Sequence, residues 1–254
     1  SHLYTPNTKE ELKDLVNHLS VNLADVDVSN ITDMSYLFEN SRRQDFSGIE
    51  EWDVSNVTNM SGMFKDCENF NHDISNLDVS NVTNMSGMFY GAKNFNHDIS
   101  NWDVSNVTNM SGMFQNASNF NQPLEKWDVS NVTNMSSMFR NAENFNQPLE
   151  KWDVSNVKDM SYMFCKMNDL DSFHSIVQSL SAIHDPKILE KLGTKFNQPL
   201  DKWNVSNVEN MNNMFANTTS FNQPLASWDV SSVTNMDSMF DYSAQNPLPY
   251  WYKG

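Results

Sequence analysis

The sequence contains little glycine, little cysteine and few cations, and each shortage excludes a class of protein. Its 254 residues include only 7 Gly, 2 Cys and 16 Lys plus Arg, against 32 Asp plus Glu, so the formal net charge is −16. An acidic surface of this kind repels phosphate groups, which argues against nucleic acid or an anionic membrane as a partner. No phosphate-binding loop, nucleophile elbow or zinc-protease motif is present in the sequence. We therefore predict that the chain is not an enzyme, has no catalytic residue, and uses no cofactor or metal.

Long apolar runs and pairable cysteines are also missing. No stretch is long enough to cross a bilayer, so we expect no membrane insertion by this segment. Cys67 takes a repeat position that Ala92 and Ala117 occupy in later copies, which is typical of a small buried filler. Cys165 lies four copies further on, about 20 Å away at roughly 5 Å per copy, beyond the reach of a disulfide. The sequence therefore predicts two free thiols.

The sequence does contain one motif, here called the phrase, that is repeated eight times. The phrase reads W-D-V-S-N-V-T-N-M-S-x-M-F, followed by a short variable patch and then by N-F-N-Q-P-L. Its Asp-Val pair recurs in steps of 26, 25, 25, 25, 25, 51 and 25 residues. The first residues of these pairs are Asp27, Asp53, Asp78, Asp103, Asp128, Asp153, Asn204 and Asp229. A fixed period of this length is typical of stacked-repeat proteins, in which each unit packs only on its neighbours.

Each copy predicts a strand, a turn, a short helix and a loop. In the fifth copy, alternation over residues 127–129 indicates a strand with Trp127 and Val129 turned inward. Residues 132–139 place Val, Met, Met and Phe at i, i+3, i+6 and i+7, which fits a short helix or a 3₁₀ turn with a Met-Phe core. The predicted fold is an α/β solenoid: a right-handed, leucine-rich-repeat-like stack of about eight 25-residue repeats.

The two ends and one long step divide this chain further. Residues 1–26 are predicted to form an N-terminal helical cap, because Asn7–Glu11 resembles a capping box and an apolar helical face follows it. Residues 27–243 form the repeats and residues 244–254 a C-terminal cap. The 51-residue step holds 26 extra residues, at about 169–194. Their apolar residues have helical spacing, which predicts two helices that either bind a partner or fold back over an edge.

The repeated phrases W-D-V-S-N-V-T-N-M-S-G-M-F and N-F-N-Q-P-L, from about residue 23 to 253, resemble those of BspA-like leucine-rich-repeat surface proteins. The same repeat class is known from mycoplasma lipoproteins. This resemblance implies a bacterial cell-surface or secreted protein, with its anchor or export signal outside this segment. It also implies an adhesin for a host extracellular-matrix or cell-surface protein, and we expect a monomer. The alternative is a structural spacer that holds another domain away from the cell.

Three groups of residues are candidates for partner binding. The repeated aspartates line one strand face if the strand prediction holds, where they accept backbone N–H bonds, dock a basic partner or hold calcium. His72 and His97 share one repeat position and each precedes an aspartate, which fits either a zinc site or polar substitutes for glutamine. The insertion adds apolar side chains. The complete candidate set is Asp53, Asp78, Asp103, Asp128, Asp153, Asp229, Phe173, Ile176, Leu180, His72 and His97.

Overall fold

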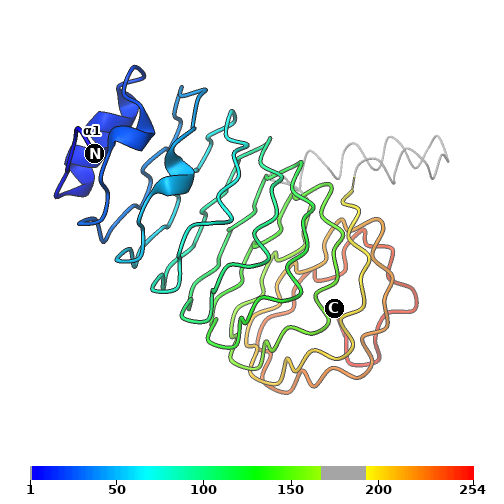
Figure 1. Ribbon diagram of the computed structural model, residues 1–254. Coiled ribbons are helices and arrows are strands. Elements are labelled where there is room, and N and C mark those ends of the chain that lie inside the picture. The colour runs from blue at the N-terminus through cyan, green and yellow to red at the C-terminus, as the bar shows by residue number, and fades with distance from the viewer. Residues whose placement is uncertain (1, 167–192) are drawn as a thin grey trace, which may run out of the picture.

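The repeats build a stack of coils, and one 25-residue copy of the phrase makes one coil (Figure 1). This computed structural model describes residues 2–166 and 193–254. The N-terminus lies at one end of the stack and the coils follow one another in chain order (Figure 1). Neighbouring coils are joined by parallel bridges at a single repeat position. The bridged residues are Asp33, Asn59, Asn84, Asn109, Asn134, Asp159, Asn210 and Asn235.

The predicted α/β solenoid with a helical cap and a helical insertion is wrong. Residues 2–166 and 193–254 contain one α-helix, α1 (Lys9–Asn17), and two 3₁₀ turns, η1 (Leu23–Asp25) and η2 (Ile49–Glu51). Within these residues β-pairing is limited to isolated bridges, so there is no sheet with helices on its opposite face. Neither the strand expected at 127–129 nor the helix expected at 132–139 is present. The predicted insertion helices, with Phe173, Ile176 and Leu180, lie outside the described residues.

Tight turns replace the predicted helix. In the second coil the turns Met60–Met63 and Phe64–Cys67 are each closed by a backbone N–H···O bond, of 3.3 and 3.0 Å. The third residue of each turn has a left-handed φ, +60° at Gly62 and +54° at Asp66. A positive φ at the third position defines a type II turn and favours Gly, Asn or Asp. Left-handed residues at every fourth position prevent the continuous i→i−4 bonding of a helix.

Within residues 62–67, the backbone N–H groups that do not close a turn donate hydrogen bonds to carbonyl oxygens of the next coil. The Gly62 nitrogen donates to the Ser86 carbonyl at 2.8 Å, and the Phe64 nitrogen donates to the Met88 carbonyl at 2.9 Å. Alternate N–H groups therefore close a turn within a coil or join two coils. This satisfies the buried backbone without regular strands or helices.

The predicted Met-Phe core is confirmed. The recurring Met and Phe side chains are buried along the stack. Successive rings of one Phe column lie 5.4–5.7 Å apart, centroid to centroid, with nearly parallel planes. This column contains Phe38, Phe64, Phe89, Phe114, Phe139, Phe164, Phe215 and Phe240. Because each ring contacts the ring of the next coil, the core is continuous along the stack.

The N-terminal end is covered by α1. The Thr8 hydroxyl accepts from the Glu11 nitrogen at 3.1 Å, and the Glu11 carboxylate accepts from the Asn7 nitrogen at 2.9 Å, so the capping box forms. Leu12 and Val16 on the apolar face of α1 are fully buried against the first coil. In the described residues 2–26 of the predicted cap (1–26), only the nine residues of α1 are α-helical.

Candidate functional site

The repeated aspartates lie on the surface, one per coil, and we call the column of Asp53, Asp78, Asp103, Asp128, Asp153 and Asp229 the acidic edge. In each case Oδ1 accepts the backbone N–H of the serine two residues later, at 3.0–3.1 Å. Asn204 makes the same bond with Ser206 at 3.1 Å, which explains why an amide can replace the carboxylate there. The hydrogen-bonding interpretation of these residues is therefore confirmed.

The serine hydroxyls strengthen this arrangement. The hydroxyls of Ser55 and Ser105 donate to the Oδ1 atoms of Asp53 and Asp103 at 2.6 Å. These hydroxyl bonds, with the backbone bonds beside them, hold the pKa of the two carboxyls below the ordinary value. Both side chains therefore keep their negative charge at neutral pH.

Counter-charges lie elsewhere on the coils. Lysines pair with glutamates of the preceding coil, as in Lys151–Glu125 at 3.2 Å and Lys202–Glu150 at 3.0 Å. Within residues 2–166 and 193–254, no Lys, Arg or His forms an ion pair with a member of the acidic edge. The edge is therefore a column of charges that the described part of the chain does not neutralise.

Neighbouring polar side chains fix the acidic edge in place. The Asn106 and Asn131 amides donate to serine carbonyls of the preceding coil, each at 2.7 Å. The Thr108 hydroxyl donates to the Thr83 carbonyl at 3.3 Å. Because the side chains on both sides are hydrogen-bonded to the backbone, little ordering remains for a partner to impose.

The two candidate histidines contact different groups. His97 Nε2 lies 3.0 Å from the carbonyl oxygen of Asn71, and Gln122 makes the equivalent contact one coil further on at 3.2 Å. His97 therefore takes the place of a glutamine, as one of the two interpretations predicted. His72 Nε2 instead lies 2.7 Å from a carboxylate oxygen of Glu50. In the described ranges, no three His, Cys, Asp or Glu side chains are grouped as metal ligands.

Sequence reasoning missed a column of asparagines at the second Asn of N-F-N. In all but the last, Oδ1 accepts the backbone N–H of the equivalent Asn in the next coil at 2.9–3.0 Å, and Oδ1 of Asn222 accepts from the Asn246 nitrogen at 3.2 Å. The column contains Asn71, Asn96, Asn121, Asn146, Asn197 and Asn222. The signal was available, because this Asn recurs where a surface loop would tolerate many residues. Its function is to join the coils.

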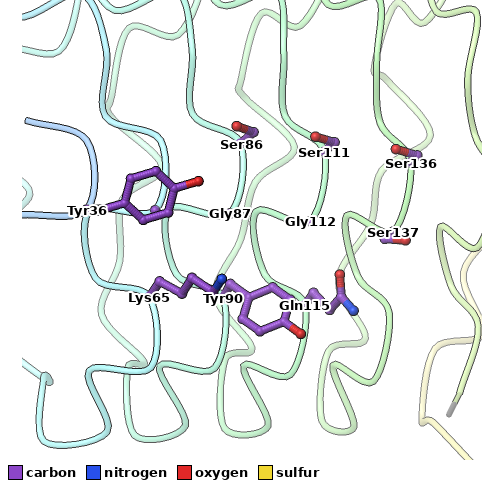
Figure 2. Close-up of a pocket in the computed structure, with 11 residues that line it drawn as sticks. Tyr36, Lys65, Ser86, Gly87, Tyr90, Ser111, Gly112, Gln115, Ser136 and Ser137 are labelled. Atoms are coloured by element: carbon purple, nitrogen blue, oxygen red, sulfur yellow. The ribbon is translucent and has the colours of Figure 1, made fainter. Parts of the chain in front are cut away.

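Sequence reasoning also missed a surface trough on the M-S-x-M-F segments, which Figure 2 shows. It has a volume of about 320 Å³ and runs across several coils. Gly87 and Gly112 lie along it, with a row of serines on one side and Tyr90 and Gln115 on the other (Figure 2). The signal was the variable residue x, which is small in four successive copies and tyrosine on both sides of them.

The two cysteines, Cys67 and Cys165, do not contribute to the acidic edge or to the trough. Both are free and buried, which confirms the prediction of two free thiols. Burial raises the pKa of Cys67 to about 12 and that of Cys165 to about 11. Neither thiol is therefore ionised at neutral pH.

The stacked coils define a repeat protein, and comparison with protein families is consistent with this. The family described as "Mycoplasma protein of unknown function, DUF285" matches residues 9–107, 97–183 and 180–251. The chain belongs to this family of bacterial repeat proteins. The resemblance to mycoplasma-type repeats is thereby confirmed.

No curated protein and no solved structure matches the chain. Among residues 2–166 and 193–254, no helix has the length and the apolar character needed to cross a membrane.

Proposed function

We propose that the chain is a surface-displayed or secreted binding module of the BspA-like kind. It acts as an adhesin domain and docks a positively charged segment of a host matrix or cell-surface protein on the acidic edge. The observation that carries this proposal is the column of six exposed carboxylates for which the described residues supply no counter-charge. Complementary charge speeds encounter with such a partner and selects against acidic ones.

The geometry of the stack favours a repeated contact. Parallel neighbours lie about 5 Å apart, so the carboxylates of successive coils are close enough to contact one extended basic segment together. Each contact is weak because it is exposed, but several contacts on one partner add up without a separate loss of translational freedom for each. The serine bonds keep one oxygen of each carboxylate occupied and leave the other for a partner.

A purely structural spacer is the second candidate. The observation in its favour is that the repeated polar side chains join one coil to the next, as the asparagine column does. A spacer needs a rigid stack but has no use for a column of charges that the stack leaves unneutralised.

The test uses two matched pairs of substitutions. Asp78→Asn with Asp103→Asn removes two charges from the acidic edge, and Asn204 shows that an amide keeps the turn. The control pair is Asp73→Asn with Asp98→Asn, because these aspartates accept the same serine N–H bond elsewhere on the coil, at 2.9 and 2.8 Å. Binding to immobilised matrix proteins and to mammalian cells is measured by interferometry at low and physiological salt.

We expect the edge pair to weaken binding roughly five- to tenfold and to reduce its salt dependence, while the control pair leaves both unchanged. Equal effects of the two pairs would contradict docking on the acidic edge. If the unsubstituted chain binds no member of the panel, the spacer is the better account.

A further inference from the structure

The trough lies at one repeat position where the side chain changes systematically. The x residue of M-S-x-M-F is small in four successive coils and is tyrosine in the coils before and after them. In chain order these residues are Tyr36, Gly62, Gly87, Gly112, Ser137 and Tyr162. All six have φ between +57° and +61°, so the backbone is the same and only the side chains differ. The Tyr36 ring covers Gly62, because an added Cβ there would clash with that ring. Beyond this ring, the small residues at Gly87 and Gly112 leave an open channel.

Two aromatic rings and one cation line this channel, and the cation, Lys65, also pairs with Glu39 at 3.9 Å. Lys65 Nζ lies 5.2 Å from the centroid of the Tyr90 ring and 6.0 Å from that of Tyr36. A similar pair, with the guanidinium of Arg140 4.6 Å from the centroid of the Tyr162 ring, is not part of the trough lining. None of the residues that line the trough is an Asp or a Glu, although the chain has 32 of them. The trough therefore differs in charge from the rest of this acidic protein.

The backbone along the trough is already hydrogen-bonded. The nitrogens of Gly62 and Gly87 donate to the carbonyls of Ser86 and Ser111 in the following coils, both at 2.8 Å. A peptide that added to the stack as an extra strand would need such groups to be free. Recognition in the trough must therefore use side-chain rings and hydroxyls.

Hydroxyl groups line the other side of the channel. Ser86, Ser111 and Ser136 form a row across three coils (Figure 2). The backbone nitrogens of Ser86 and Ser111 donate to Oδ1 of Asn84 and Asn109 at 2.9 Å, which fixes the row. The hydroxyls of Ser86 and Ser111 make no hydrogen bond within the described part of the chain, so they remain able to bond a ligand. The Ser136 hydroxyl donates to Oδ1 of Asn134 at 2.7 Å and can still accept a hydrogen bond from a ligand.

We propose that this trough binds an oligosaccharide. A sugar ring has an apolar C–H face, which packs on the Tyr90 ring, and rim hydroxyls, which bond to the serine row and to the Gln115 amide. An extended oligosaccharide presents its hydroxyls repeatedly, as the serine row presents its own across three coils. A nucleic acid also stacks on rings, but the net charge of −16 opposes it. This site is separate from the acidic edge and goes beyond the function proposed above.

The test fills the channel with a residue that the fold already accepts. Gly87→Tyr places at φ +60° the side chain that Tyr36 and Tyr162 carry at +58°. An added Cβ at Gly87 meets its nearest neighbour, Tyr90 Cβ, at 3.8 Å, which is ordinary contact. Ser238→Tyr is the matched control, because Ser238 has the same repeat position and a φ of +56° but lies in the last coil, away from the trough. Tyr90→Ala is a second, independent variant.

The unsubstituted chain is screened on an oligosaccharide array of neutral and acidic glycans, and the best oligosaccharide is then titrated by calorimetry. We expect Gly87→Tyr and Tyr90→Ala to weaken binding about tenfold or more, and Ser238→Tyr to leave it unchanged. All three variants should bind matrix proteins as the unsubstituted chain does, so failure here is distinguishable from failure of the acidic edge. Binding of no glycan, or equal binding by Gly87→Tyr and Ser238→Tyr, would overturn the proposal.

Discussion

At the scale of single residues, one aspartate oxygen of the acidic edge serves the fold in each coil, while the charge on the same side chain forms no ion pair within the described residues. Asp103 Oδ1 accepts from Ser105 as Asn204 Oδ1 accepts from Ser206, at 3.0 and 3.1 Å. The turn therefore requires an acceptor and not a carboxylate. Seven of the eight copies nevertheless carry aspartate at this position. This separation of acceptor from charge makes the acidic edge testable without disturbing the coils.

The depressed carboxyl pKa values predict acid sensitivity. The pKa of Asp53 and of Asp103 is lowered by the serine bonds from the ordinary 3.8, so the unfolded chain binds more protons than the folded chain. Their contribution to stability is therefore complete above pH 3.8 and is lost as the pH falls through the folded values. We expect the thermal midpoint to fall less steeply below that pH in Asp53→Asn/Asp103→Asn than in the unsubstituted chain. Scanning calorimetry across this range checks it, and parallel curves would refute it.

At the scale of the element, the spacing of apolar residues identified the core but not the backbone that presents it. Val132, Met135, Met138 and Phe139 fit one helical face, and all four are buried. Successive tight turns bury the same positions, so periodicity alone could not decide between the two. The deciding signal was the left-handed residue at Ser137, repeated four residues later at Asn141. Gly, Asn, Asp and Ser at those positions across the copies favour turns.

Left-handed φ at the x position predicts which substitutions the turn tolerates. Gly87 has φ +60°, and an added Cβ finds ordinary contact only, so conformation and not space sets the outcome. We expect Gly87→Val to lower the free energy of unfolding by about 1–2 kcal/mol, because a β-branched residue is strained there. Gly87→Asn should be nearly neutral, since Asn213 has φ +55° at the equivalent position. Urea unfolding of both variants measures the difference, and equal losses would contradict it.

At the scale of the whole molecule, the coils form a one-dimensional array. Its repeat length, its Met-Phe core and its lack of pairable cysteines could be predicted, because each follows from residues that recur at fixed positions. The acidic edge could be predicted as a column, but its hydrogen bonds remained one of three alternatives. The small residues at x were visible in the sequence, but the trough could not be predicted from them, because it also depends on where neighbouring rings lie and on which backbone groups are already bonded. Both depend on contacts between coils.

The one-dimensional array also predicts how the stack unfolds when a coil in its middle is destabilised. Phe114 lies between Phe89 and Phe139, with both centroids 5.6 Å away, and it is fully buried. Phe114→Ala should cost about 3–5 kcal/mol locally, through lost contacts and the cavity that remains. Because each coil packs only on its neighbours, this loss should uncouple the coils before it from those after it, and the two halves should then unfold separately.

Amide hydrogen exchange read coil by coil tests this uncoupling. Phe240→Ala is the matched control, because Phe240 occupies the same repeat position in the last coil, 5.7 Å from Phe215. The control should lower protection only near the C-terminal end, as fraying of a terminal unit does. Phe114→Ala should instead give two groups of coils with different protection, separated at the substituted coil. If both variants lower protection uniformly from the first coil to the last, the stack unfolds as one cooperative unit and the one-dimensional description fails.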